Sequence, residues 1–165
     1  MATKQRTKTP RTTLRDRRQR LALVPLFRRC TSREIGTIAD AVVDRDATGG
    51  DVLCAEGEEG EEFFIIVTGQ ATVTRRGEEL AILRPGAFFG EMAMLDGGPR
   101  TSSVTAASDM RLLVLSRRRF HEVLAKSPSM GQKLLTELAC RLRAVEGELN
   151  RLRDAVKGQV DAASW

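Results

Sequence analysis

Glu91 and Arg100 are charged residues nine positions apart in a segment whose residue types suit a phosphate ligand. The guanidinium of Arg100 is permanently charged, and its planar fork matches phosphate oxygens. Gly90 has no Cβ, so a ligand can approach the backbone closely at that position. Residues 92–95 can form one helical turn, and its free N–H groups favour an anion. The segment therefore predicts an anion-binding site.

Glu91 indicates what else such a ligand must contain. A carboxylate beside a phosphate is repulsive unless it has a partner of its own, and a sugar hydroxyl is a suitable donor. Thr101 and Ser102 add hydroxyl donors next to Arg100. This set favours a ligand that holds a phosphate and a sugar hydroxyl close together. The same residues have an alternative interpretation, a buried Arg–Glu pair that only holds a tight turn closed.

The glycine-rich middle of the chain is typical of a β structure that could hold this site. Ten of the fourteen glycines fall between residues 49 and 98, with short apolar segments between them. The predicted fold class is mainly β with flanking helices (α+β), with the strands arranged as a sandwich or a barrel. Residues 63–67 are apolar throughout, so both faces of that strand should be covered. The clearest strand segments are residues 52–55, 63–68, 71–76, 80–83, 103–106 and 112–115.

Helices are predicted on both sides of the strands. Thr31 and Glu34 form a capping box ahead of an apolar run with helical spacing. After the strands, residues 117–125 have one apolar face, and Pro128 marks the start of a long helix. The apolar run after the capping box consists of Ile35, Ile38, Ala39, Val42 and Val43.

The long helix carries a heptad seam of apolar residues. Their spacing alternates between three and four positions, which is typical of a coiled coil. In a parallel dimer the flanking positions would pair Arg141 with Glu146 and Glu148 with Arg153. The pattern predicts a homodimer, and the alternative is a stripe that packs on the helix's own domain. The seam consists of Leu135, Leu138, Leu142, Val145, Leu149, Leu152 and Val156.

Composition limits the classes of function. The chain has 165 residues, of which 41% are apolar and 30% charged, and this suits one soluble globular domain. No apolar run reaches the ~20 residues of a membrane span and no secretory signal is recognisable, so a cytoplasmic protein is expected. No catalytic motif is recognisable, so we expect no enzyme, no catalytic cofactor and no metal site. Cys30, Cys54 and Cys140 are expected to be buried reduced thiols.

Positive charge is concentrated at the N-terminus. Residues 1–20 contain eight basic residues and one acid, a net charge of +7, so the remaining chain carries −2 of the total of +5. Residues 1–16 are predicted to be a disordered basic tail, followed by a short helix over residues 17–23. The tail is either an arm for nucleic acid or membrane, or a solvated terminus. Residues 17–157 would form the folded domain, and residues 158–165 a C-terminal tail.

Residues 89–95 and 99–104 resemble the phosphate-binding cassette of the cyclic nucleotide-binding domain family, which includes bacterial catabolite activator proteins and protein kinase regulatory subunits. Their sequences are FGEMAML and PRTSSV. The resemblance extends over about residues 20–155 and includes the Pro-Gly turn before the cassette. The family implies a jelly-roll-like antiparallel β-barrel of about eight strands, flanked by helices, that binds a cyclic nucleotide and transmits the binding event.

The resemblance implies a cyclic AMP (cAMP) or cyclic GMP (cGMP) ligand and a role for each matching position. Arg100 would pair with the cyclic phosphate, and Glu91 would accept the ribose 2′-hydroxyl. Thr101 is compatible with a guanine as well as an adenine base. Val73 would form an apolar wall for the base. Backbone groups would come from Gly90, Met92 and Ala93.

The function implied is that of a regulatory sensor. Ligand binding would move the long helix and change its contacts with a dimer partner or an effector protein. Two alternatives are a nucleic-acid-associated transcriptional regulator that uses the basic arm, and a dimerisation module whose pocket binds nothing. Catabolite activators read adenine with a Thr-Ser pair where this chain has Val145 and Glu146, so the choice between the two nucleotides stays open.

Overall fold

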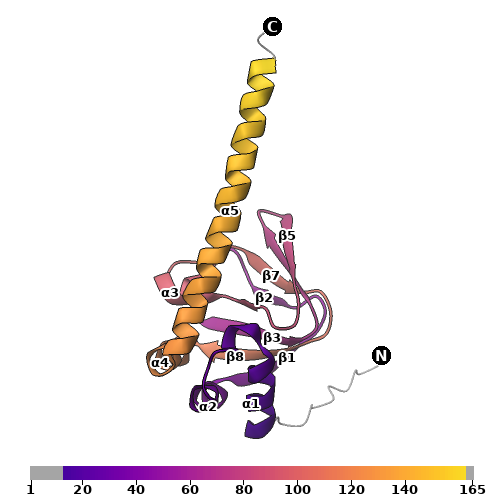
Figure 1. The fold of residues 1–165 in the computed structure, drawn as a ribbon. Coiled ribbons are helices and arrows are strands. Elements are labelled where there is room, and N and C mark those ends of the chain that lie inside the picture. The colour runs from indigo at the N-terminus through magenta and orange to yellow at the C-terminus, as the bar shows by residue number, and fades with distance from the viewer. Residues whose placement is uncertain (1–12, 163–165) are drawn as a thin grey trace, which may run out of the picture.

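The computed structural model describes residues 13–162, and it describes side chains as far as residue 156. Helices flank two antiparallel sheets, and the last helix runs well past the sheets (Figure 1). The helices are α1 (Leu14–Leu23), the 3-10 helix η1 (Pro25–Phe27), α2 (Ser32–Ala41), α3 (Glu91–Asp96), α4 (Arg117–Lys126) and α5 (Pro128–Ala162). The strands are β1 (Val43–Ala47), β2 (Val52–Cys54), β3 (Glu62–Thr68), β4 (Ala71–Arg75), β5 (Glu78–Leu83), β6 (Phe88–Phe89), β7 (Ser103–Ala106) and β8 (Met110–Ser116).

The strands form two four-stranded sheets rather than one closed barrel. One sheet has the order β1-β8-β3-β6 and the other the order β2-β7-β4-β5, and all pairings are antiparallel. The prediction of a mainly β, antiparallel fold with flanking helices is confirmed, and the two sheets of the jelly-roll-like fold are not closed into a barrel. The β4–β5 hairpin projects away from the body of the domain (Figure 1), and the side chains of β5 are largely exposed. Within the described residues, this edge strand therefore pairs with β4 alone.

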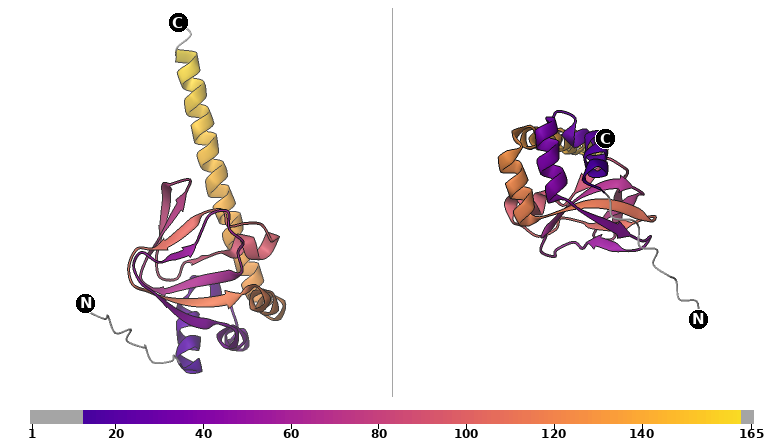
Figure 2. Two further views of the ribbon diagram at one scale, coloured as in Figure 1. Left: turned by 180° about the vertical axis from the view of Figure 1, so that it is seen from behind. Right: turned by 90° about the horizontal axis from the view of Figure 1, so that it is seen from below.

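Strand β3 lies between two hydrophobic cores. Phe63 and Ile65 belong to the core that the strand shares with the N-terminal helices, α4 and the start of α5. Phe64 and Ile66 belong to the second core, which β3 shares with β7 and β8. The prediction that both faces of this strand are covered is confirmed. Figure 2 shows the N-terminal helices and α4 gathered on one side of the sheets.

Helix α1 begins earlier than the sequence analysis predicts. The Thr13 hydroxyl accepts a hydrogen bond from the backbone N–H of Asp16, and the Asp16 carboxylate accepts one from the Thr13 backbone N–H. This capping box starts the helix at Leu14, so the end of the predicted tail is helical. Residues 1–12 of that tail lie outside the described residues. At the other end of the chain, α5 continues to Ala162, so the predicted C-terminal tail is largely helical.

Helix α2 ends before the apolar pattern does. Val42 is the C-cap residue and is buried, whereas Val43 is the first residue of β1 and is exposed. The prediction that both valines extend the apolar face of the helix is therefore wrong. Residues 43–47 pair with β8, and this long-range pairing overrides the local helical spacing.

The Glu34 carboxylate connects the beginnings of two helices. It accepts a hydrogen bond from the Thr31 backbone N–H at 2.8 Å, which completes the predicted capping box of α2. Its second oxygen accepts a hydrogen bond from the Ser129 backbone N–H at 3.1 Å, in the first turn of α5. Only 8% of Glu34 is exposed. The hydrogen bonds from Thr31 and Ser129 lower the pKa of this carboxyl below its ordinary value.

Replacing Glu34 with alanine is expected to lower the free energy of unfolding by about 1–3 kcal/mol, because two backbone donors lose their acceptor. Glu34→Gln keeps an acceptor and should cost less. A depressed pKa stabilises the fold above the unfolded-state value of 4.5, and this stabilisation is lost as the pH falls through the folded-state pKa. The difference between wild type and Glu34→Gln in thermal unfolding should therefore shrink below about pH 4.5. Equal stability of both proteins at pH 7 would contradict this role.

Candidate functional site

One pocket contains all seven site residues that the sequence analysis names. It lies between the β2-β7-β4-β5 sheet, the segment from β6 through α3, and helix α5. Several other residues that were not predicted for the site also line it, among them Cys54, Leu83, Phe88 and Arg141. The predicted lining residues are Val73, Gly90, Glu91, Met92, Ala93, Arg100 and Thr101.

Arg100 is buried at the base of the pocket and is held by main-chain oxygens. Its Nη1 donates a hydrogen bond to the Gly90 carbonyl at 3.0 Å, and its Nη2 donates one to the Glu62 carbonyl at 2.6 Å. These bonds attach the guanidinium to the start of α3 and to the start of β3. Both acceptors are neutral, so the positive charge of Arg100 is not cancelled by them, and a guanidinium has further N–H donors for a ligand.

Gly90 permits the arrangement around Arg100. Its φ is +87°, a left-handed conformation that non-glycine residues rarely adopt. A Cβ on Gly90 would lie 2.5 Å from Arg100 Nη1 and 2.7 Å from the Glu62 carbonyl oxygen. The sequence predicts that a ligand approaches the backbone closely at this glycine. In the structure, the Arg100 guanidinium and the Glu62 carbonyl of β3 already leave no room for a side chain at position 90.

Glu91 pairs with a residue of the long helix. Arg141 Nη1 donates to Glu91 Oε1 at 2.6 Å, and the Arg141 guanidinium lies 4.7 Å from the centre of the Phe88 ring. Glu91 is buried, whereas about half of the Arg141 side chain is exposed. The alternative of a Glu91–Arg100 pair that closes the turn is therefore wrong, because each residue has other partners. The predicted pairing of Arg141 with Glu146 of a second copy stays a prediction, since the contact with Glu91 is made within one chain.

The far wall of the pocket is apolar. Val73 on β4 pairs in register with Val104 on β7, and Cys54 of β2 also lines the pocket. Burial raises the pKa of the Cys54 thiol to about 11, so it stays protonated and neutral. Cys54 is buried as predicted and Cys30 is partly so, whereas Cys140 is exposed on α5, which makes the prediction for that cysteine wrong.

The rim of the pocket carries Thr101 and Met92. Thr101 is exposed, and its hydroxyl lies 3.9 Å from the sulfur of Met92. The pocket thus has a cationic end at Arg100, a carboxylate at Glu91 and an apolar wall.

Across residues 13–162, no helix is long and apolar enough to cross a bilayer. The same part of the chain holds no group of three acidic, His or Cys side chains that could bind a metal ion.

Comparison with known proteins identifies the family. The family model described as "Cyclic nucleotide-binding domain" matches residues 45–127, which is half of the chain, so the chain belongs to this family. A curated relative from Mycobacterium tuberculosis, the CRP-like cAMP-activated global transcriptional regulator, is 31% identical over 134 residues. That match covers 78% of this chain and 60% of the relative.

Solved structures show the same fold. The catabolite activator protein of Thermus thermophilus superposes with a TM-score of 0.72 and 32% identity, covering 78% of this chain and 62% of that protein. The regulatory domain of Toxoplasma gondii PKA with cAMP superposes with a TM-score of 0.69 and 27% identity, covering 78% and 50%. The chain thus spans less than two thirds of the length of these relatives.

Proposed function

We propose that the pocket binds a cyclic nucleotide, cAMP or cGMP, and that the chain is a regulatory domain rather than an enzyme. The observation that carries this proposal is the convergence of the buried Arg100 guanidinium, the buried Glu91 carboxylate and the Val73 wall on one pocket. Related structures support it, because two protein kinase A regulatory proteins of this fold were solved with cAMP. Both nucleotides remain candidates, since Thr101 suits either base.

The two charged groups have separate roles in this proposal. Arg100 is oriented by the carbonyls of Gly90 and Glu62, and its remaining donors bind the cyclic phosphate. Glu91 accepts the ribose 2′-hydroxyl. Backbone groups of Met92 and Ala93 in α3 complete the polar end of the site. The apolar wall at Val73 contacts the base.

Arg141 connects the site to helix α5. It contacts Glu91 through one carboxylate oxygen, so the second oxygen can accept the sugar hydroxyl. A ligand that changes the position of Glu91 therefore changes a contact that holds α5 over the pocket. We infer that ligand binding shifts the population of α5 positions in this way. The hydrogen bond from the Ser129 backbone N–H to the Glu34 carboxylate holds the N-terminal end of the same helix.

The output of this movement is a contact made by α5 with a second copy or an effector protein. Leu138 of the predicted seam packs against the domain's own core, so part of the seam serves its own fold. The remaining seam residues are exposed, and α5 projects beyond the sheets (Figure 1). We propose that they form a parallel coiled-coil homodimer. These exposed residues are Leu135, Leu142, Val145, Leu149, Leu152 and Val156.

Replacing Glu91 with alanine is expected to weaken cAMP or cGMP binding about 10- to 100-fold, because a hydrogen bond to a charged group is lost. The affinity for the 2′-deoxy form of the same nucleotide should change little, since that ligand has no 2′-hydroxyl to donate a hydrogen bond to Glu91. Isothermal titration calorimetry with both ligand pairs measures this difference. Glu91→Gln, which keeps an acceptor, should be intermediate. An equal loss for ribose and deoxyribose ligands would show that Glu91 does not contact the 2′-hydroxyl.

A further inference from the structure

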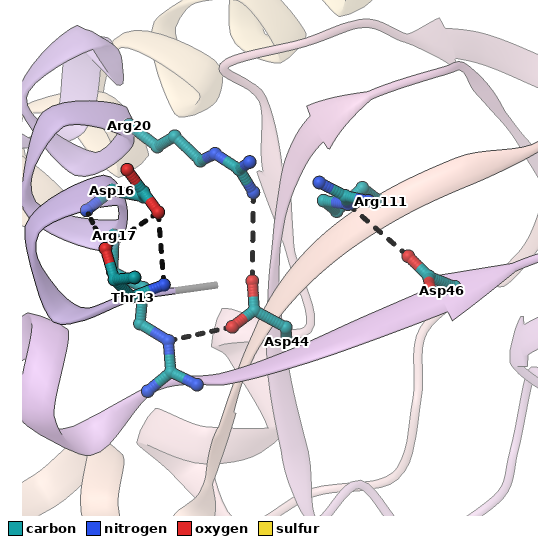
Figure 3. Close-up of polar contacts among 7 residues, drawn as sticks. All are labelled: Thr13, Asp16, Arg17, Arg20, Asp44, Asp46 and Arg111. Atoms are coloured by element: carbon teal, nitrogen blue, oxygen red, sulfur yellow. Dashed lines mark hydrogen bonds and ion pairs between the residues drawn. The ribbon is translucent and has the colours of Figure 1, made fainter. Parts of the chain in front are cut away.

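Two arginines of α1 attach this helix to the first sheet. Arg17 Nε lies 2.8 Å from Asp44 Oδ2, and Arg20 Nη1 lies 3.9 Å from Asp44 Oδ1. Figure 3 shows both side chains reaching from α1 toward Asp44 on β1. Their charges are therefore used within the fold, since one carboxylate faces both of them.

Five other arginines of the N-terminal layer have no such partner. Arg15 and Arg18 leave α1 in other directions, because each residue of a helix is turned by about 100° from the previous one. The Arg18 guanidinium lies over α2, with Nη2 only 3.1 Å from the ideal Cβ position of Gly36. Among the described residues, no ion pair involves any member of this basic surface, and all of them are exposed. The basic surface consists of Arg15, Arg18, Arg28, Arg29 and Arg33.

Acidic residues do not offset this charge. Residues 13–41, the described part of this region, contain seven basic and three acidic residues, a net charge of +4, whereas residues 42–165 carry −3. Two of the three acids, Asp16 and Glu34, are engaged in the capping boxes of α1 and α2. Within the described residues, the net positive charge is therefore concentrated on one layer of the domain, on the side of the sheets where α1 and α2 lie (Figure 2).

The chemistry of this surface favours a row of phosphates. Guanidinium groups are weakly hydrated and bind phosphate oxygens through two parallel hydrogen bonds. A membrane-lying helix would need a continuous apolar face. In α1, Leu21 is buried in the core, and the exposed Leu14 and Leu23 are nine residues apart, so they point about 180° away from each other. A nucleic acid backbone presents closely spaced phosphates without requiring an apolar contact.

We propose that the basic surface binds the phosphate backbone of nucleic acid without reading its sequence. This binding does not involve the nucleotide pocket, because Arg100 and Glu91 lie on other elements. It requires neither cAMP nor cGMP. Its failure would leave the proposed pocket function untouched.

Fluorescence anisotropy with a labelled 20-base-pair DNA duplex tests the proposal on the full chain without added nucleotide. The logarithm of the affinity should fall linearly with the logarithm of the salt concentration. Replacing Arg28, Arg29 and Arg33 together with glutamine should weaken binding about tenfold or more at low salt and reduce the slope by about 2 to 3. The matched control, Arg75→Gln with Arg76→Gln and Arg84→Gln, removes the same charge from the β4–β5 hairpin region and should leave both values near wild type.

Three outcomes of these binding measurements with the wild type and the glutamine variants would overturn the proposal. The first is an absence of salt-dependent DNA binding by the wild type, and the second is an equal loss of DNA affinity in the basic-surface variant and the control. The third is tighter binding to phosphatidylserine vesicles or polyglutamate than to the duplex at the same salt concentration.

Thermal unfolding of both triple variants should match the wild type, because none of the substituted side chains has a hydrogen bond or ion pair in the described residues. If the glutamine variant unfolds early, Arg28→Lys with Arg29→Lys and Arg33→Lys keeps the charge and should keep the salt slope. A slope lost in that lysine variant would likewise contradict the proposal.

Discussion

Replacing Arg100 with leucine is expected to lower the affinity for cAMP and cGMP at least about a hundredfold. A bidentate, charge-assisted contact with a phosphate contributes about 1.5–3 kcal/mol for each hydrogen bond, and leucine retains neither the charge nor a donor. The same change also removes the two bonds to the carbonyls of Gly90 and Glu62. The variant should therefore unfold at a lower temperature than the wild type, so binding and stability must be measured together.

Arg117 offers a matched control for the structural part of this effect. Its Nη2 donates to the Gly60 carbonyl at 2.6 Å, close to the cassette, yet Arg117 does not line the pocket. Arg117→Leu should lower the unfolding temperature but change the affinity only a few fold. Calorimetric titration at a temperature where all three proteins are folded separates the two effects. Similar affinity losses in both variants would mean that Arg100 acts through the fold and does not bind the phosphate.

Replacing Leu142 and Leu149 together with aspartate is expected to convert the proposed homodimer into monomers. Both side chains are about half exposed in the single chain, at 59% and 47%, so they contribute little to the fold of the domain itself. A buried aspartate at two core positions of a coiled coil places charges in an apolar seam, which costs several kcal/mol for each ion. Size-exclusion chromatography with light scattering gives the mass of the particle directly.

Ala144→Asp with Asn150→Asp is the control for the dimer. It adds the same charge to the same stretch of α5, at positions outside the heptad seam. This variant should keep the mass of the wild type. A monomeric wild type at micromolar concentration, or equal dissociation of both variants, would contradict the dimer.

The cassette could be predicted from the sequence because its residues are close together in the chain. Gly90 through Arg100 form one continuous turn, short helix and loop, so their residue types show which groups can meet. The contact between Glu91 and Arg141 could not be predicted from the sequence, since the two residues are fifty positions apart and meet only because α5 lies over α3. The spacing of the seam places Arg141 at a flanking position, which suggested a partner across a dimer instead.

The predicted ends of helices and strands are wrong where contacts between distant residues decide the structure. Val42 and Val43 fit a helical period, but Val43 pairs with Val114 of β8 and starts a strand. That the two sheets are not closed into a barrel could not be predicted either, because local alternation identifies strands without showing which edges join. The start of α1 was readable, since Thr13 and Asp16 form a capping box by the same spacing as Thr31 and Glu34.

Titration of the wild-type chain with cAMP and with cGMP in a calorimeter tests the central proposal most directly. We expect saturable binding of at least one of the two nucleotides, at one site per chain, accompanied by a higher unfolding temperature in its presence. The same nucleotide should produce no saturable signal with Arg100→Leu. The absence of both heat and stabilisation at millimolar concentrations of either nucleotide would contradict the proposal and leave a folded domain whose pocket does not bind these ligands.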